Sequence, residues 1–374
     1  MDLRQLSTPG AVVDLDRLER NAAWMTNRAK DLGVSLRPHV KTHKCVEAAN
    51  LQTGGLSRKI TVSTLAEARA FATAGFDDIT YAVPLSPDKI PACAQLQKQT
   101  GTFHVLLDQP ETMVALEGYG AAHGLQFSVF LKVDCGLHRA GVDPASPEAV
   151  ALAGRLHRSN QLDFRGILTH AGQSYRCRNR SEAAAVAAHE RDVMVTFAET
   201  LRGKGLAVAE ISIGSTPTIT AADRLPGISE VRPGNYLFFD AFQTAIGSCS
   251  VDGVAFSVLT TVIGVYPDGR RLVVDAGALA LSKDPGPTHV DPDCGFGVVV
   301  SERDCRPVSG LKVTSLAQEH GVMHSDGPLD PAWRPGTRFR ILPNHSCLAA
   351  ACFDTFSVVR GTELVDQWHP VRGW

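Results

Sequence analysis

The amino-acid sequence predicts an α/β protein: a closed (β/α)8 barrel of TIM type, followed by a β-rich domain. Short apolar runs alternate with helical patterns over the first two thirds of the chain, and short strands replace the helices after about residue 245. An open doubly wound sheet is the alternative for such alternation. No Gly-rich dinucleotide fingerprint follows the first strand of the series, which favours the barrel.

One strand precedes the first helix. The segment "TPGAVVDLDRL" (8–18) places the apolar run 11–13 directly before a helical pattern. This strand lies outside the regular alternation of the barrel. It is therefore a candidate to cross over and pair with the β-rich domain.

Eight apolar runs are the candidate barrel strands. They are residues 34–39, 59–63, 79–83, 103–108, 127–134, 164–170, 209–214 and 228–234. The segments between them have the spacing of amphipathic helices, for example 64–76, which stops at Gly75, and 181–205, which stops at Gly203 and Gly205. Repeated strand–helix units predict a parallel sheet, and eight of them predict a closed barrel.

The C-terminal third has the pattern of short strands. Residues 256–282 predict two strands joined at the turn Pro267-Asp268-Gly269, and residues 336–373 have the same character. We therefore expect a barrel domain of residues 15–244. The β-rich domain is expected to consist of residues 1–14 plus 245–374.

The composition favours a small-molecule partner. With 37 Lys and Arg against 39 Asp and Glu, the formal charge is -2, which provides no field to collect nucleic acid or an anionic membrane. Nine cysteines, an odd number in a chain of this size, indicate reduced thiols. No signal peptide is recognisable, and no window approaches the roughly 20 apolar residues of a membrane span. We expect a cytoplasmic protein.

Unusual polar residues follow the expected strands at the end where a barrel carries its chemistry. They are His39, Lys41, Ser63, Thr64, Arg139, His170, Gly214–Thr216 and Arg232–Asn235. Each of them alone also fits a capped loop or a surface charge. Lys41 is the sharpest candidate, because burial and the cations Arg37 and Lys44 would lower its pKa, and a neutral amine forms a Schiff base with a carbonyl.

Two segments are suited to a phosphate group. "SIGSTPT" leaves a strand into Gly214, Ser215 and Thr216, and "RPGNY" leaves the next strand with Gly234 and Asn235. Barrels commonly bind phosphate between their last two strand–helix loops, and these are the last two here. A Gly-Ser-Thr sequence after a strand is also an ordinary helix start.

His345 and Cys347 in "PNHSC" form a candidate metal site. On an extended segment, side chains two residues apart point the same way, so the imidazole and the thiolate would share one ion. This ligand pair favours Zn2+ over hard cations and leaves Mn2+ open. For an isolated His-x-Cys, a buried thiol near a histidine is the commoner explanation.

Six motifs in this order carry a family resemblance: "RPHVKTHK", "VDCGLHRAGV", "LTHAGQSY", "SIGSTPT", "RPGNY" and "PNHSC". Nearly end to end, the chain resembles the metal-dependent D-threonine aldolases and D-serine dehydratases, fold-type III pyridoxal phosphate enzymes related to alanine racemase. The resemblance implies a barrel of alanine racemase type with a C-terminal β-domain, the cofactor pyridoxal 5'-phosphate, a divalent metal and a homodimer.

The resemblance also implies roles for single residues. Lys41 is expected to bind pyridoxal phosphate as a Schiff base and to move the α-proton. His345 and Cys347 are expected to bind the metal. The other cofactor-binding positions are His170 and Tyr175 against the ring, Arg139 beside the phenolic oxygen and the substrate carboxylate, and Arg232 at the pyridine nitrogen, where this branch varies. Gly214, Ser215, Thr216, Gly234 and Asn235 are expected around the phosphate, and Tyr236 completes the cofactor-binding set.

The implied activity is that of a lyase acting on D-β-hydroxy-α-amino acids. Within the family, the aldolases carry a carboxylate at the second metal-ligand position and the dehydratases a cysteine, so Cys347 favours a dehydratase of D-serine or D-threonine type. A D-threonine aldolase is the alternative, and an amino-acid racemase a more distant one. A non-catalytic pyridoxal phosphate carrier would have no use for "PNHSC".

Overall fold

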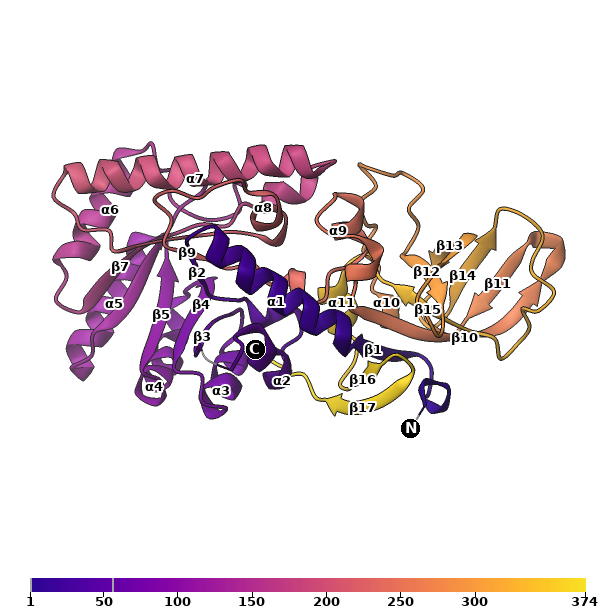
Figure 1. Ribbon diagram of the computed structural model, residues 1–374. Helices are drawn as coiled ribbons and strands as arrows, with labels where there is room; N and C mark the ends of the chain where they lie inside the picture. Colours follow the sequence, from indigo (N-terminus) through magenta and orange to yellow (C-terminus); the bar gives the residue numbers. More distant parts are fainter. Residues whose placement is uncertain (1, 56) are drawn as a thin grey trace. The chain divides into compact units, whose positions relative to one another are not determined.

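The computed structural model describes residues 2–55 and 57–374 and divides the chain into two units (Figure 1). The barrel unit contains Trp24–Gly234 and Val371–Trp374. The β unit contains the chain up to Ala23 and Asn235–Pro370. The domains expected from the sequence, 15–244 and 1–14 plus 245–374, stay a prediction beside this division, which falls inside the first helix and just after Gly234.

Within the described residues, the barrel unit contains an eight-stranded parallel sheet. In spatial order its strands are β2 (Ser35–Leu36), β9 (Glu230–Val231), β8 (Glu210–Ile213), β7 (Leu162–Leu168), β6 (Phe127–Lys132), β5 (Thr102–Leu107), β4 (Asp78–Pro84) and β3 (Lys59–Val62). The two ends of this order meet just beyond β2, where His39 bridges Thr61 and the Thr61 N–H donates to the Pro38 carbonyl oxygen over 2.9 Å. The sheet is a nearly closed barrel, which confirms the predicted class.

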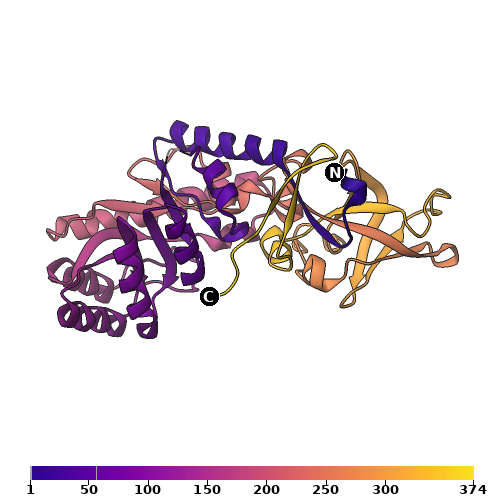
Figure 2. The same cartoon turned by 90° about the horizontal axis from the view of Figure 1, so that it is seen from below.

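Helices connect the strands and lie outside them (Figures 1 and 2). The α-helices are α1 (Leu15–Asp31), α2 (Val46–Gln52), α3 (Leu65–Thr73), α4 (Ile90–Gln99), α5 (Pro110–His123), α6 (Pro147–Arg158), α7 (Arg180–Gly203) and α8 (Thr216–Ala221). Short 3-10 helices are η2 (Val40–Thr42), η3 (Pro87–Lys89) and η4 (Gly172–Arg176).

The helix ends follow the local signals in the sequence. Helix α3 begins after Thr64, whose hydroxyl accepts the Glu67 N–H over 3.0 Å, and it ends before Gly75, whose φ of +88° is left-handed. Helix α7 begins after Asn179, whose side chain accepts the Glu182 N–H. The predicted helices 64–76 and 181–205 are therefore confirmed.

The β unit is built on a mostly antiparallel sheet. Its strand order is β11 (Arg271–Val274), β14 (Gly321–Ser325), β13 (Pro307–Leu316), β12 (Val298–Ser301), β15 (Arg338–Leu342), β10 (Phe256–Tyr266), β1 (Gly10–Asp14), β16 (Phe356–Arg360) and β17 (Glu363–Trp368). Strand β10 also pairs with β11, so the strands from β10 to β15 curve into a barrel-like sheet, coloured orange in Figure 2. Its short helices are η1 (Leu3–Gln5), η5 (Asn235–Leu237), α9 (Ala241–Ala245), η6 (Val251–Gly253), η7 (Pro267–Gly269), α10 (Ala278–Leu281) and α11 (Ser346–Ala350).

Strand β1 crosses into this sheet, as the sequence indicated. It pairs antiparallel with β10 and parallel with β16. Val12 is fully buried there, in one cluster with Leu3, Leu259 and Val359. The predicted turn at Pro267–Gly269 also forms, between β10 and β11.

One local expectation is wrong. The sequence predicts that His345 and Cys347 lie on an extended segment, but only His345 is extended, as the N-cap of helix α11. Cys347 lies in the first turn of that helix. The two side chains meet across a helix start, because the backbone turns at Ser346.

Among residues 2–55 and 57–374, no helix is both long enough and apolar enough to cross a membrane.

Candidate active site

Lys41 lies at the barrel's strand-end face, in the short helix η2 that follows β2. The His39 side chain caps this helix and accepts the Lys41 N–H over 3.4 Å. The other nitrogen of the His39 ring lies 3.4 Å from the Ser63 hydroxyl, at the end of β3. The Lys41 side chain is exposed. The loop that carries the amine is thus fixed to two neighbouring strands.

His170 lies among four cationic side chains, three of which were predicted to bind the cofactor. Burial lowers the pKa of His170 well below its ordinary value, and the positive charges of Lys41, Lys132, Arg139 and Arg232 lower it further. A neutral imidazole at neutral pH follows from this environment. The structure therefore brings Lys41, Arg139, His170 and Arg232 close together although the chain separates them widely.

His39 belongs to the same cluster. Burial is the largest cause that lowers its pKa well below the ordinary value, followed by the charges of Lys41 and Arg232 and by His170. Two neutral imidazoles therefore lie beside the Lys41 amine. Such groups accept or donate a proton without adding a further positive charge.

The expected burial of Lys41 is wrong, since its side chain is exposed. The two cations that the sequence offered as its neighbours each form an ion pair with a carboxylate, and their effect on the pKa of Lys41 stays a prediction. Arg37 is buried and forms ion pairs with Asp78 and with Glu230, the latter at 2.6 Å. Lys44 pairs with the buried carboxylate of Glu67 at 3.0 Å. These carboxylates neutralise both side chains.

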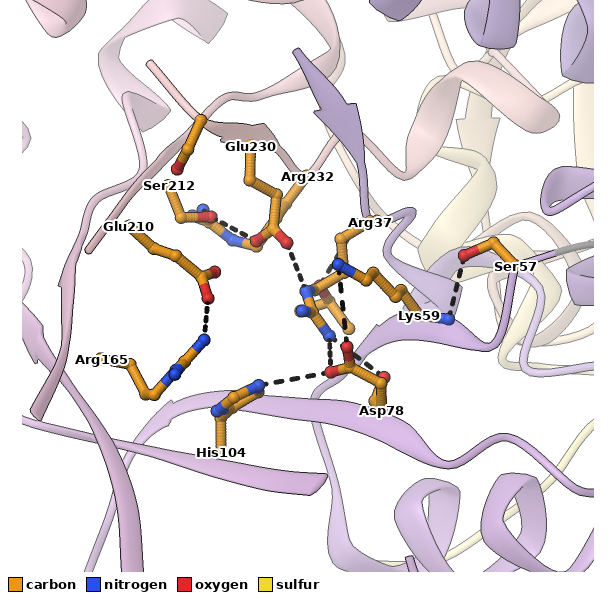
Figure 3. A network of polar contacts seen from close by, with 12 residues as sticks. Arg37, Ser57, Lys59, Asp78, His104, Arg165, Glu210, Ser212, Glu230 and Arg232 are labelled. Atoms are coloured by element: carbon orange, nitrogen blue, oxygen red, sulfur yellow. Dashed lines mark hydrogen bonds and ion pairs between the residues drawn. The ribbon is translucent and has the colours of Figure 1, made fainter. Parts of the chain in front are cut away.

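A chain of polar contacts inside the barrel leads to Arg232 (Figure 3). Arg37 Nε donates to Glu230, and the Ser212 hydroxyl donates to the other oxygen of Glu230 over 2.6 Å. Because that hydroxyl has one proton, its lone pairs accept from Arg232 Nη1, while Arg232 Nη2 donates to the Thr169 carbonyl. Burial lowers the pKa of Arg232 to about 10, so it stays charged at neutral pH. Its guanidinium is held by Ser212 on β8 and by Thr169, which directly follows β7.

The opposite end of the barrel carries a polar cavity of about 320 Å³. Its lining includes Lys59, Asp78, His104, Arg165 and Glu210, which lie near the starts of their strands (Figure 3). His104 contacts Asp78 at 3.3 Å, and Arg165 contacts Glu210 at 2.5 Å. Barrel enzymes carry their chemistry at the strand ends instead, so this cavity is not the active site.

The loop after β8 is shaped by Gly214. Its φ is +109°, and a Cβ there would lie 3.0 Å from the Ile219 side chain. Its N–H donates to Glu190 over 3.0 Å, and the Ser215 N–H donates to the Thr218 hydroxyl over 2.9 Å. Two backbone donors that the sequence offered to a phosphate are therefore used within the protein. The Ser215 hydroxyl caps helix α8, which begins at Thr216.

The loop after β9 also contains predicted phosphate-binding residues that make contacts within the protein. A Cβ on Gly234 would lie 2.7 Å from the His39 carbonyl oxygen, so only glycine fits between this loop and the one that carries Lys41. The Asn235 side chain donates to Asp240 over 2.8 Å and to the Ser346 hydroxyl over 3.0 Å. It is thus bound within the β unit, where Tyr236 is fully buried. The phosphate roles of these residues stay a prediction.

The chemistry of the barrel cluster fits pyridoxal phosphate. A primary amine, two imidazoles and several cations suit an anionic cofactor that carries an aldehyde. Gly234 lies so close to His39 that it cannot carry a side chain, so its own backbone is not covered by one. Tyr175, expected against the ring, is half-buried in η4 on the loop after β7.

Two buried charged residues near the site were not among the residues predicted from the sequence. Lys132 at the end of β6 is buried, and burial, with the charges of Arg232 and Arg139, lowers its pKa to about 7. Glu190 on α7 is fully buried and accepts the N–H groups of Ala171 and Gly214. A lysine inside the apolar run "FSVFLKV" was a readable signal for the first. Glu190 gave none, because glutamate is common in helices.

The candidate metal ligands His345 and Cys347 lie together in the β unit. Burial lowers the pKa of His345, but the negative charge of Cys347 and the hydrogen bonds that His345 donates to Asp284 and Cys347 outweigh it and raise the pKa above its ordinary value. His345 Nδ1 lies 3.1 Å from the Asp284 carboxylate. The Ser346 N–H donates to Asp240 over 3.0 Å, which anchors the start of α11. An imidazole and a thiol in contact are suitable donors for a divalent ion.

A nearly closed parallel barrel with an amine among cations at its strand ends, joined to an antiparallel β unit, defines the class of fold-type III pyridoxal phosphate enzymes. Two family models match the chain. "Alanine racemase, N-terminal domain" matches residues 13–241, and "Putative serine dehydratase domain" matches residues 255–359.

Curated relatives agree with these matches. D-threo-3-hydroxyaspartate dehydratase of Delftia sp. (strain HT23) is 40% identical over 100% of this chain and 99% of that protein. D-serine dehydratase of Dictyostelium discoideum is 34% identical over 100% of this chain and 98% of that protein. A D-threonine aldolase of Arthrobacter sp. is 28% identical over 98% and 92%.

Solved structures give the same result. The D-threo-3-hydroxyaspartate dehydratase in a metal-free form, with one cysteine replaced by alanine, superposes with a TM-score of 0.94 at 39% identity and covers 100% of both chains. Alanine racemase of Clostridium difficile, at 15% identity and a TM-score of 0.69 over 97% of this chain and 99% of that chain, shares the fold alone. The chain belongs to the family of D-serine dehydratases and D-threonine aldolases, and it is a pyridoxal phosphate-dependent lyase.

Proposed function

We propose that this lyase removes water from D-β-hydroxy-α-amino acids, with pyridoxal phosphate and a divalent metal, to give a 2-oxo acid and ammonia. The observation that carries the proposal is the gathering of Lys41, His170, Arg139 and Arg232 at one face of the barrel. Three relatives that match all of this chain at more than 30% identity support the dehydratase branch, since each of them is a dehydratase.

Lys41 is the proposed base. Its amine lies beside two imidazoles that are neutral at neutral pH, so a proton taken from the substrate α-carbon has nearby acceptors. Arg139, exposed on the loop after β6, is proposed to bind the substrate carboxylate. Arg232, fixed by Ser212 and Thr169, is proposed to orient the cofactor ring.

Pyridoxal phosphate supplies an electron sink for charge that develops at the substrate α-carbon. We propose that the loops at Gly214–Thr216 and Gly234–Tyr236 hold its phosphate group, with Tyr175 and His170 against its ring. The N–H groups of Gly214 and Ser215 already donate to Glu190 and Thr218. In this proposal the phosphate therefore contacts hydroxyl groups and Gly234 instead.

His345 and Cys347 are proposed to hold the metal, with Zn2+ favoured and Mn2+ the alternative. The ion supplies a Lewis acid that lowers the cost of negative charge on a departing hydroxyl. The relative solved without metal lacks a cysteine, which supports a cysteine ligand in the family. That this site and Lys41 face the same substrate stays a prediction, because the two lie in different units.

Product analysis tests the proposal. Purified enzyme is given D-serine, D-threonine or D-threo-3-hydroxyaspartate in separate reactions. The matching 2-oxo acid and ammonia support dehydration, whereas glycine plus an aldehyde would assign the enzyme to the aldolase branch. Racemisation without any cleavage, unaffected by a chelator, would replace both by the racemase alternative.

Two controls link the products to the site. Lys41→Ala should abolish turnover and remove the near-visible absorbance of the bound cofactor. A chelator should abolish turnover until Zn2+ or Mn2+ is added back. A homodimer and a cytoplasmic location complete the proposal.

A further inference from the structure

Asp284 contacts the candidate metal ligand His345 in a directed way. Its carboxylate oxygen Oδ2 lies 3.1 Å from His345 Nδ1. A carboxylate accepts, so the hydrogen bond requires a proton on Nδ1. In a neutral imidazole the lone pair is then on Nε2. The contact thus selects the ring nitrogen that is able to bind an ion.

Asp284 is itself fixed by the residues around it. Its other oxygen accepts the Gly286 N–H over 2.8 Å. Its carbonyl oxygen accepts from Asn344 Nδ2 over 3.1 Å, and the same amide donates to the Gly295 carbonyl over 2.8 Å. Asn344 directly precedes His345, so the loop of the carboxylate is tied to the backbone of the ligand.

The packing of this loop leaves little freedom. Gly286 has a φ of +73°, and a Cβ there would lie 2.5 Å from the Asn344 side chain. The side chains of His345 and Asp284 are 36% and 21% exposed. The pair is therefore partly shielded from water but not fully buried.

We propose that Asp284 is a positioning residue for the metal: it holds the His345 ring with Nε2 available and adds a negative charge beside the ion. The inference rests on the proposed metal site at His345 and Cys347. Carboxylates that hydrogen-bond to a ligating histidine contribute roughly 10- to 100-fold in metal affinity.

The experiment measures metal affinity rather than turnover. The protein loaded with pyridoxal phosphate competes with a chromophoric chelator for Zn2+. Asp284→Ala should weaken binding by about 10- to 100-fold. Asp284→Asn, which keeps the volume and an acceptor oxygen but loses the charge, should fall between the wild type and Asp284→Ala. Asp293→Asn, an exposed carboxylate in the same segment, should bind as the wild type does.

Cobalt gives a second readout. With Co2+, the charge-transfer absorbance from Cys347 should persist in Asp284→Asn, because the thiolate ligand is intact, while the weaker visible bands shift with the altered imidazole. Unchanged cofactor content shows that the variant is folded. If Asp284→Ala fails to fold, the result for Asp284→Asn decides.

Two outcomes separate the inference from the proposal on which it rests. Wild-type Zn2+ affinity in both Asp284 variants, with weak binding in His345→Ala, overturns the role of Asp284 alone. Wild-type affinity in His345→Ala and Cys347→Ala as well would remove the metal site, and the positioning role with it.

Discussion

Lys132 shows how one buried residue changes the charge state of a site. It ends β6 with its side chain buried, beside Arg232, Cys135 and Arg139. Burial removes the water that stabilises an ammonium ion, and nearby cations add repulsion. The pKa of Lys132 therefore falls to about 7, and the amine is partly neutral under ordinary conditions. It is a second amine at the strand ends, next to His170.

The low pKa of Lys132 predicts that the free energy of unfolding depends on pH. Between the folded value of about 7 and the unfolded value of about 10.4, only the unfolded chain binds the proton, so stability rises with pH by up to about 1.4 kcal/mol per pH unit. Below pH 7 the full cost of the buried charge remains. Lys132→Met should therefore be more stable than the wild type at pH 7, and this difference should shrink towards pH 10.

Urea unfolding of the cofactor-free proteins at several pH values measures this difference. Lys204→Met, at an exposed position, is the matched control and should show no such trend. A constant difference between Lys132→Met and wild type across the range would contradict the prediction.

At the scale of elements, helix α7 links two loops of the active site. Glu190 on this helix accepts the N–H of Ala171, after β7, over 3.1 Å and the N–H of Gly214, after β8, over 3.0 Å. It is fully buried, and burial raises its pKa. One carboxylate thereby sets the spacing between the His170 loop and the Gly214 loop.

Glu190→Ala should loosen both loops. Two buried N–H groups would lose their acceptor, which costs about 1–3 kcal/mol for each group. We expect faster hydrogen exchange at Ala171 and Gly214, lower thermal stability and weaker cofactor binding. Glu199→Ala, an exposed change on the same helix, should stay within about 0.5 kcal/mol of the wild type. Unaltered exchange at the two amides in Glu190→Ala would refute the linkage.

At the scale of the whole molecule, the N-terminal strand β1 joins two strands from the C-terminal third of the chain into one sheet. β1 lies between β10 and β16, with Val12 and Val13 fully buried. Removing it would separate two inner strands of the sheet and expose their edges. The last residues contribute far less: the Val371 N–H donates to the Lys44 carbonyl oxygen over 2.8 Å, while Trp374 is 89% exposed.

Two truncations test this contrast. Deleting residues 2–14 should give an insoluble or unfolded protein. Deleting residues 372–374 should change the free energy of unfolding by less than about 0.5 kcal/mol. Soluble yield and near-ultraviolet circular dichroism measure both. A folded, soluble protein without residues 2–14 would show that β1 is dispensable.

The local pattern predicted much of the fold and part of the site. The spacing of apolar residues identified the barrel, because strand and helix periods are properties of neighbouring residues. It did not predict the start of α11 at Ser346, since five helical residues are too few to show a period. The motifs placed Lys41 and His170 at strand ends, where the structure brings them together.

The sequence by itself determined which elements form, in which order, and which residues end the barrel strands. Only the tertiary structure decided which charges meet. Arg37 pairs with Glu230, 193 residues further along the chain, and the local pattern did not predict this partner. Periodicity is a local property, whereas ion pairs, burial and the pKa values that follow from them depend on strands that the chain brings together from far apart.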